Sequence, residues 1–446
     1  MNPTILALAL SLVAATAQAA PPESAPRPSP RLALADPDAA GAFLDRVRAM
    51  RPRPRAAAQG DAPSLDPAKD TAFRAWTRGF RDRALAHGIS RTVIDRAFDG
   101  VTYDPEVIRR DSNQSEFTKT IWEYLDSAAS DTRIANGRAA LARHAATFDA
   151  IEARYGVEKE IVAAVWGLES AYGTFKGKSD IVRSLATLAF DGRRGAFFEE
   201  QLIAALRILQ AGDTDARHMT GSWAGAMGHT QFIPSSYLDY AVDFDGDGRR
   251  HIWGDDPTDA LASTAAYLSR FGWQKGQPWG VEVRVPSNFD YAQAQRTVTR
   301  LPSEWARFGV TGIDGAVPDH GPASVLLPAG ADGAAFLVFN NFAVIERYNT
   351  ADAYVIGVGH LADRLKGVRP IRGAWPRGDR ALTRAEREEL QSRLTATGFD
   401  TQKIDGRIGP LTIEAIRGFQ RRQGLVPDGY ASLRLLEAMR TDARGG

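Results

Sequence analysis

Cysteine is absent from the 446 residues of the chain. Its absence excludes disulfide bridges, thiolate zinc sites, a cysteine nucleophile and lipidation on a cysteine. Histidine is scarce as well, and because the seven histidines form no HExxH or HxH pair, a zinc hydrolase is not expected. No sign of charge dominates: the formal net charge is +1, so no global field favours nucleic acid or an anionic membrane surface.

A long apolar run is missing too. The run near the start, from Ile5 to Ala15, is shorter than the roughly 20 residues that a membrane span requires. It is followed at 17–19 by AQA, the A-x-A pattern of a signal-peptide cleavage site. The alternative is a membrane anchor, but we expect residues 1–19 to be a signal peptide. The mature chain, with no transmembrane span and no acylatable cysteine, should then be periplasmic or secreted and not a lipoprotein.

Composition divides the remaining chain into three parts. Residues 20–67 are rich in Pro, Ala and Arg, which is typical of an extended linker. Residues 68–372 carry apolar residues at helical spacing and predict one large, mainly α domain. Residues 373–446, which begin in the turn-rich stretch RPIRGAWPRGD, predict a small domain of three helices. Short strands are expected within the large domain at VEVRVP (281–286), QRTVTRL (295–301) and AAFLVF (334–339).

The stretch IVAAVWGLESAYGTF, residues 161–175, contains a single carboxylate, Glu169. On a helix it flanks an apolar stripe that includes Val165, and it lies next to Trp166 in projection. A carboxyl against such surroundings loses hydration, which favours the protonated form that a general acid needs. The alternative is a solvated glutamate on the polar edge of a helix. The stretch alone favours the solvated glutamate.

The next motif is GSWAGAMGHTQFIPSSY, residues 221–237, which we call the glycine-rich wall. Its small residues let the backbone approach a ligand closely, and Ser222 and Gln231 offer hydrogen-bonding groups. Its aromatic residues could stack on sugar faces. Close packing of helices through small residues explains the glycines and alanines equally well, so both interpretations stay open.

An acidic loop follows directly, in AVDFDGDGRR. Asp243, Asp245 and Asp247 have the D-x-D-x-D-G spacing of the first half of an EF-hand calcium loop, and the backbone oxygen of Arg249 falls at the next ligand position. The glutamate that normally closes such a loop is absent. One of three later acids would have to close the shell: Asp255, Asp256 or Asp259. The alternative is an acidic turn without a metal.

Together these motifs resemble the lytic murein transglycosylases of the B type, the family of membrane-bound lytic transglycosylase B. The matching segments are VWGLESAYG (165–173), SLATLAF (184–190), GSWAGAMGHTQFIPSSYLDYAVDFDGDG (221–248) and FNNFAVIERYN (339–349). The tail, with DGRIGPLTIEAIRGFQRRQGLVPDG, resembles helical peptidoglycan-binding domains. The resemblance implies a lysozyme-like helical catalytic domain with extra helical lobes and a small β element, plus the three-helix C-terminal domain.

The resemblance also implies roles for particular residues. Glu169 would be the catalytic acid. The saccharide would be bound by Ser222, Gln231, Tyr267, Tyr348 and Tyr354. Calcium, in a structural role, would be held by Asp243, Asp245, Asp247, Asp259 and the carbonyl of Arg249. The segment before Asp259 is slightly longer here than in the family pattern.

The resemblance finally implies a reaction. The enzyme would cleave the MurNAc-β-1,4-GlcNAc bond of peptidoglycan and leave a 1,6-anhydromuramoyl end, with no organic cofactor and as a monomer. Two alternatives stay open: a hydrolytic muramidase that uses the same acid, and a non-catalytic scaffold that binds peptidoglycan.

Overall fold

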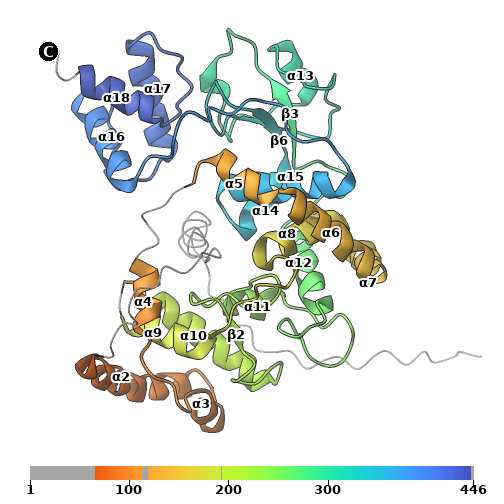
Figure 1. Cartoon of the computed structure of the whole chain (residues 1–446), viewed down its shortest axis with the longest axis vertical. Coiled ribbons are helices and arrows are strands. Elements are labelled where there is room, and N and C mark those ends of the chain that lie inside the picture. The colour runs from red at the N-terminus through yellow and green to blue at the C-terminus, as the bar shows by residue number, and fades with distance from the viewer. Residues whose placement is uncertain (1–65, 113–118, 192, 443–446) are drawn as a thin grey trace, which may run out of the picture.

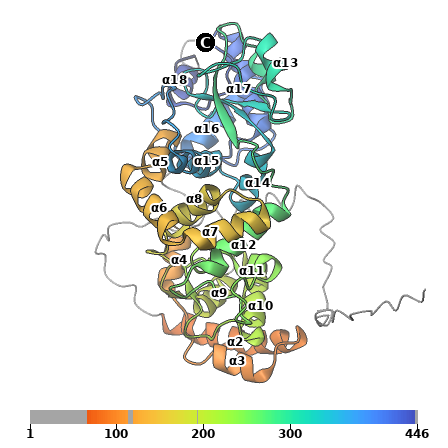
Figure 2. The same ribbon diagram turned by 90° about the vertical axis from the view of Figure 1, so that its right-hand side faces the viewer.

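The computed structural model describes residues 66–112, 119–191 and 193–442. The predicted signal peptide and almost all of the predicted linker lie outside the described residues. Within them the chain forms an elongated, mainly helical molecule, with one helical lobe at the bottom of Figure 1 and a small sheet at the top. Figure 2, turned by 90°, shows a layer of helices between these two parts. The predicted fold class is confirmed.

The lower lobe is built from helices that pack on the paired helices α9 and α10. Its members are α2 (Pro67–Ala86), α3 (Arg91–Ala97), α4 (Pro105–Ser112), α9 (Ile181–Phe190), α10 (Gly195–Ala211) and α11 (Pro234–Tyr240). Side-chain caps fix where two of them begin: Asp66 accepts from the N–H of Ala68, and Ser90 from the N–H of Val93.

The middle layer surrounds helix α8 (Lys159–Ser170), from which Glu169 projects. Residues Ile161 to Gly167 are all buried, so α8 is apolar all round, as expected of a central helix. The other helices of the layer are α5 (Ile121–Ala128), α6 (Asp131–Arg143), α7 (Ala145–Tyr155), α12 (Thr258–Arg270), α14 (Asn340–Tyr348) and α15 (Asp352–Lys366). Four of these, α6, α7, α12 and α15, pack directly against α8.

The sheet at the top is antiparallel, with strand order β4-β3-β6-β5. The elements of this region are β3 (Gly280–Arg284), β4 (Thr311–Gly312), β5 (Ser324–Leu326), β6 (Ala335–Val338), the 3-10 helix η2 (Tyr291–Gln293) and α13 (Pro302–Arg307). A separate two-stranded ladder pairs β1 (Ser179–Asp180) with β2 (Thr220–Gly221).

Two of the three predicted strands are confirmed, as β3 and β6. The prediction for QRTVTRL was wrong, because this segment makes only an isolated bridge, between Arg300 and Ala323. Its alternating pattern is interrupted by a turn, in which the N–H of Val298 donates to the carbonyl of Gln295. Pro302 then begins a helix two residues after the bridge.

The C-terminal part forms the three expected helices, α16 (Arg384–Ala396), α17 (Pro410–Arg422) and α18 (Leu433–Asp442). They enclose a core of their own that includes Leu390, Ile416 and Leu436. The domain also contacts the sheet region, because Asp428 accepts from the N–H of Ala331 at 2.9 Å and Arg417 donates to the carbonyl of Ala294 at 3.0 Å.

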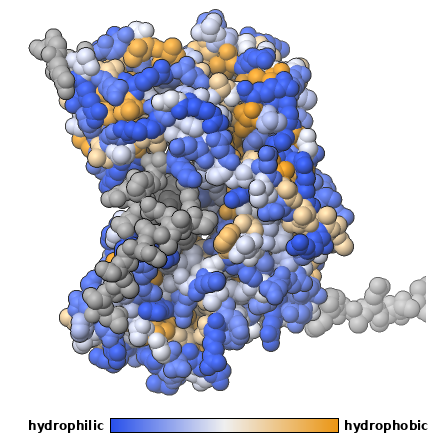
Figure 3. All heavy atoms as spheres, viewed as in Figure 1, coloured by the Kyte–Doolittle hydropathy of each residue, from blue (hydrophilic) through white to orange (hydrophobic). Residues whose placement is uncertain are grey.

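The surface seen in Figure 3 is mostly polar, with small apolar patches scattered over it. Among the residues that the structure describes, no helix is both long enough and apolar enough to cross a membrane.

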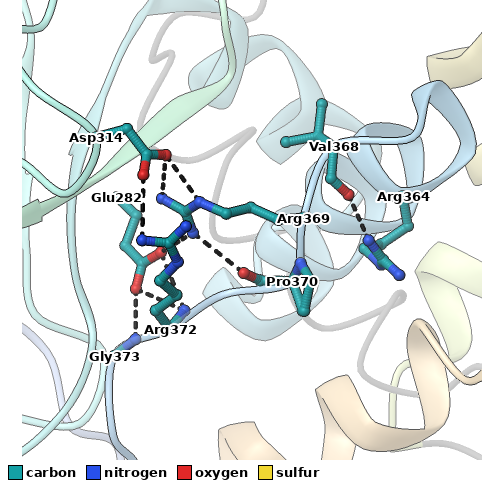
Figure 4. A network of polar contacts seen from close by, with 8 residues as sticks. All are labelled: Glu282, Asp314, Arg364, Val368, Arg369, Pro370, Arg372 and Gly373. Carbon is teal, nitrogen blue, oxygen red and sulfur yellow. Dashed lines mark hydrogen bonds and ion pairs between the residues drawn. The ribbon is translucent and has the colours of Figure 1, made fainter.

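A charged cluster fixes the segment between α15 and the C-terminal domain to the sheet (Figure 4). Glu282 of β3, whose side chain is 8% exposed, pairs with Arg369 and accepts from the N–H groups of Arg372 and Gly373. On the outer side, Asp314 pairs with both arginines and is 61% exposed. Glu282 is therefore the buried acceptor that holds the chain against the sheet after it leaves α15.

We expect Glu282→Ala to loosen this segment. The change removes the acceptor of Arg369 and of two backbone N–H groups, and a hydrogen bond to a charged group contributes ~1.5–3 kcal/mol. Limited trypsin digestion should cleave the Arg372–Gly373 bond about tenfold faster than in the unchanged protein. Asp314→Asn is the matched control, because exposed ion pairs contribute little. Equal cleavage rates in Glu282→Ala and the unchanged protein would contradict the role of Glu282.

Candidate active site

Helix α8 ends in a turn whose backbone conformation is rarely adopted by residues other than glycine. Directly after Ser170, three successive residues have positive φ: Ala171 at 48°, Tyr172 at 57° and Gly173 at 83°. Left-handed backbone is uncommon for residues other than glycine and persists where surrounding contacts enforce it. We call residues 171–173 the left-handed turn. Glu169 is the second-last residue of the helix that this turn terminates.

Contacts from three sides hold the left-handed turn. The N–H of Gly173 donates to Ser170 Oγ at 3.0 Å, and Ser170 Oγ donates in turn to the carbonyl of His229 at 2.5 Å. The hydroxyl of Tyr172 donates to the carbonyl of Arg133 at 3.0 Å. A Cβ on Gly167 would lie 2.6 Å from the Tyr172 ring, so that glycine makes room for the ring. These contacts offset the strain of the turn.

Glu169 is half-buried, and its carboxyl contacts a helix that is far away in the sequence. The hydroxyl of Tyr354, in the first turn of α15, donates to Glu169 Oε1 at 2.7 Å across a sequence separation of 185 residues. Tyr354 itself is 5% exposed. The acid is thus neither a freely solvated edge residue nor fully enclosed, because it lies at the end of a buried helix with its carboxylate oriented by a phenol.

The glycine-rich wall backs directly onto the segment after the turn. A Cβ on Gly177 would lie 2.1 Å from the carbonyl oxygen of Gly221, so the two backbones touch. Ser222 Oγ accepts from the N–H of Ala226 at 3.0 Å within the wall. Gln231, at φ 56°, donates through its amide to the carbonyls of Lys176 and Gly228 at 2.9 and 2.8 Å. Close packing therefore accounts for the small residues, and Gln231 joins the wall to the segment that follows the left-handed turn.

Tyr267 and Tyr348 lie behind this wall. Their exposed fractions are 2% and 1%, and their rings pack edge to face at 5.2 Å. The Tyr267 hydroxyl donates to the carbonyl of Arg347 and the Tyr348 hydroxyl to that of Thr230, each at 2.6 Å. Of the three tyrosines predicted to line the cleft, Tyr354 reaches Glu169. Direct contact of the other two with saccharide stays a prediction.

The acidic loop brings three carboxylates together. Oxygens of Asp243, Asp245 and Asp247 lie within 4.8 Å of one another. Asp259 lies beneath the loop, 2% exposed, where Oδ1 accepts from the N–H of Phe244 at 2.8 Å and Oδ2 from that of His251 at 2.7 Å. Burial raises the pKa of Asp259. Three converging carboxylate oxygens are a donor set that fits calcium, with Asp259 supporting the loop from below.

The N–H of Arg249 donates to Asp247 Oδ1 at 2.8 Å, which shapes the loop at the position predicted to supply a carbonyl ligand. Gly246 and Gly248 both have positive φ, at 80° and 88°, as the tight path of the loop requires.

Two residues that contact the candidate site, His229 and Lys176, were not predicted from the sequence. The ring of His229 lies between Trp166 and the carbonyl of Gly254, and Lys176 Nζ donates to the carbonyls of Trp253 and Gly254 at 2.8 and 2.6 Å. Both bond to backbone carbonyls, and His229 also bonds to Trp166, which lies 63 residues away in the sequence. Such contacts leave no spacing pattern by which they could have been found.

Comparison with known families decides the assignment. The transglycosylase SLT domain matches residues 72–363, which is more than half of the chain. The chain belongs to the transglycosylase SLT family. A second family, the peptidoglycan binding domain, matches residues 383–439 of this SLT family member.

Solved structures support the same assignment. SltB3 from Pseudomonas aeruginosa, in complex with NAG-anhNAM-pentapeptide, is 50% identical, covers 82% of this chain and 99% of its own, and superposes with a TM-score of 0.81. The lytic transglycosylase Slt35 of Escherichia coli, in complex with calcium, is 30% identical over 65% of this chain and 92% of its own, with a TM-score of 0.57.

Among curated proteins, membrane-bound lytic murein transglycosylase B of Escherichia coli (strain K12) is 36% identical over 213 residues. The match spans 46% of this chain and 56% of that protein.

We expect Tyr354→Phe to lower kcat about tenfold, since a hydrogen bond to a charged group contributes ~1.5–3 kcal/mol and ~1.4 kcal/mol is a factor of ten in rate. The ring stays in place, so Tm should change little. Turnover of purified sacculi measures the effect, with Tyr291→Phe in the core of the sheet region as the control. If kcat is unchanged, the contact with Glu169 has no part in the reaction.

Proposed function

We propose that this SLT family member is a lytic transglycosylase that cleaves the MurNAc-β-1,4-GlcNAc bond of peptidoglycan and leaves a 1,6-anhydromuramoyl end. The observation that carries the proposal is the placement of Glu169, a half-buried carboxyl at the strained end of a buried helix, oriented by Tyr354. The complex of the relative SltB3 with NAG-anhNAM-pentapeptide supports the anhydro product.

In the proposed reaction Glu169 acts twice. It first donates its proton to the glycosidic oxygen as the bond to C1 breaks, while the N-acetyl group of the muramoyl residue stabilises the positive charge that develops at C1. The carboxylate then accepts the proton of the C6 hydroxyl as O6 bonds to C1. The proton that leaves Glu169 is replaced, and no water is consumed.

One carboxylate is enough because the substrate supplies the nucleophile. Ordinary glycosidases need two carboxylates on opposite sides of the bond. The glycine-rich wall, residues 221–237, contains no Asp or Glu. An internal hydroxyl that is already positioned has a large advantage over water, because its approach costs little further entropy.

Two kinds of role are proposed for the remaining site residues. Tyr354 orients the acid, and Ser222 and Gln231 shape the wall against which the saccharide lies. Tyr348 supports that wall from behind through its hydrogen bond to the carbonyl of Thr230, and Tyr267 packs its ring against Phe232 of the wall.

The rest of the chain is proposed to bring this site to the cell wall. Residues 68–372 would form the catalytic domain and residues 373–446 the peptidoglycan-binding domain, with 20–67 as a linker. The signal-peptide pattern at 1–19 supports export to the periplasm, where the substrate lies.

We also propose a structural calcium ion in the acidic loop, held by Asp243, Asp245, Asp247 and the carbonyl of Arg249, with Asp259 as the ligand that closes the site from beneath. Bound calcium would neutralise the mutual repulsion of the three carboxylates and fix the loop. The calcium complex of the relative Slt35 supports this proposal.

Substitution of the acid tests the reaction. Glu169→Gln should fold normally and lose activity by about 10²–10⁴-fold, the usual contribution of general acid–base catalysis. The control is Glu160→Gln, the same change in the first turn of the same helix. Digestion of purified sacculi with mass spectrometry of the products measures both rate and outcome.

The products separate the alternatives. Anhydromuramoyl ends support the transglycosylase, whereas reducing ends would identify a hydrolytic muramidase. A chain that binds sacculi and releases nothing would be a scaffold. Full activity in Glu169→Gln would refute the role of Glu169.

Removal of calcium tests the loop. Calcium at 100 times its Kd should stabilise the fold by about 2.7 kcal/mol, so stripping it with a chelator should lower Tm by several degrees. In Asp245→Asn the chelator should have a smaller effect, because one of the three carboxylates is lost. An unchanged Tm after removal of all bound metal from the wild-type chain would rule out the calcium site.

A further inference from the structure

His229 lies between the helix of the acid and the loop that follows the acidic residues. Its side chain is buried, 3% exposed, and both ring nitrogens have partners. The indole Nε1–H of Trp166 donates to His229 Nδ1 at 3.2 Å, and His229 Nε2 lies 2.8 Å from the carbonyl oxygen of Gly254. Trp166 is on α8, one turn before Ser170, and thus three residues before Glu169.

These two partners fix the protonation of the ring. An indole N–H can only donate, so Nδ1 must carry the lone pair, and a carbonyl can only accept, so Nε2 must carry the proton. A second proton on Nδ1 would point at the indole N–H and break the contact. Burial, opposed in part by the Gly254 carbonyl, lowers the pKa of His229 to about 4, so the ring is neutral near neutral pH.

The backbone of the same residue holds the left-handed turn. Its carbonyl accepts from Ser170 Oγ, and its N–H donates to the carbonyl of Ile252 at 3.1 Å. The ring also touches the turn, since a Cβ on Gly173 would lie 2.7 Å from His229 Nδ1 and Cε1. His229 therefore contacts the acid's helix through both its ring and its carbonyl, and the turn after it directly through its ring.

The carbonyl of Gly254 joins this arrangement to the other side of the site. It accepts from Lys176 Nζ at 2.6 Å as well as from His229 Nε2. Lys176 follows the left-handed turn, and its own carbonyl accepts from Gln231 of the wall. The contacts form a closed loop through Trp166, His229, Gly254 and Lys176, with Glu169 on the segment that this loop encloses.

From this geometry we propose that His229 is a positioning residue for Glu169: its neutral imidazole, protonated on Nε2, fixes α8 through Trp166 against the Gly254 carbonyl. The inference rests on the proposed function of Glu169. His229 does not exchange a proton with the substrate. It sets where the carboxyl of Glu169 lies for both of its proton transfers.

Two substitutions separate the two ring contacts. In His229→Asn the side-chain oxygen lies where Nδ1 was and still accepts from Trp166, but the amide does not reach Gly254. In His229→Gln the amide reaches the place of Nε2 and donates to Gly254, but nothing accepts from Trp166. Each variant thus keeps one contact and loses the other in a similar volume.

The expected order of the activity losses follows from the contact that connects His229 to the helix of Glu169, which is the hydrogen bond with Trp166. On purified sacculi, kcat per folded molecule should fall about tenfold in His229→Gln and about threefold or less in His229→Asn, with KM within about twofold of wild type in both. Trp166→Phe should resemble His229→Gln. The double variant, which combines His229→Gln with Trp166→Phe, should be no slower than the slower of these two single variants. Both changes remove the same hydrogen bond, between Trp166 and His229.

Three outcomes would overturn the inference: equal kcat per folded molecule in the Asn and Gln variants, a change in KM alone, or additive losses in the double variant. Loss of folded protein in proportion to loss of activity would likewise reduce His229 to a core residue. The unchanged chain is assayed alongside. If it releases no anhydromuropeptides, the proposed function fails, whereas an active unchanged chain with unaffected variants refutes only the role of His229.

Discussion

The site depends on one constraint, the three left-handed residues that terminate α8 directly after Glu169 and Ser170. Two of the three carry side chains and would leave this conformation in an isolated peptide. They stay because Tyr172 is bonded to Arg133, and Gly173 is bonded to Ser170, which is itself bonded to His229. The middle layer, the wall and the loop after the acidic residues can all be understood as the partners that this turn requires.

The glycines of this region allow neighbouring segments of the chain to pack in close contact, and their role is not flexibility. Gly177 and Gly221 bring two backbones into contact, and Gly173 admits the ring of His229. A side chain at either place would push the wall away from the segment after the turn. Small residues in the wall are needed for close packing and would also let a ligand approach the backbone. The two interpretations of the wall are therefore compatible.

The sequence predicts those parts of the fold that have a period. The mainly helical character of residues 68–372, the three C-terminal helices and the strands β3 and β6 follow from apolar spacing. The prediction for the segment 295–301 was wrong because a turn breaks its alternation. Glu169 could be singled out because it is the single carboxylate of the apolar stretch 161–175. Its contact with Tyr354, 185 residues away, could not, and neither could the hydroxyls of Tyr267 and Tyr348, whose partners are backbone carbonyls.

A single carboxyl that first gives a proton and then takes one back must serve two oxygens of the substrate without a second group to share the work. On the proposed mechanism the glycosidic oxygen departs with the GlcNAc residue, whereas O6 belongs to the muramoyl residue. Both oxygens bond to C1 in turn, so both lie within reach only if the carboxyl keeps its place throughout. A mobile glutamate could find either oxygen but would not be aligned with both in turn. Rigid placement then matters as much as acidity. On the proposals above, this chain provides rigid placement in three ways. The backbone after Glu169 is held in a strained turn, the phenol of Tyr354 bonds to its carboxyl oxygen, and the buried neutral imidazole of His229 bonds to Trp166 of its helix.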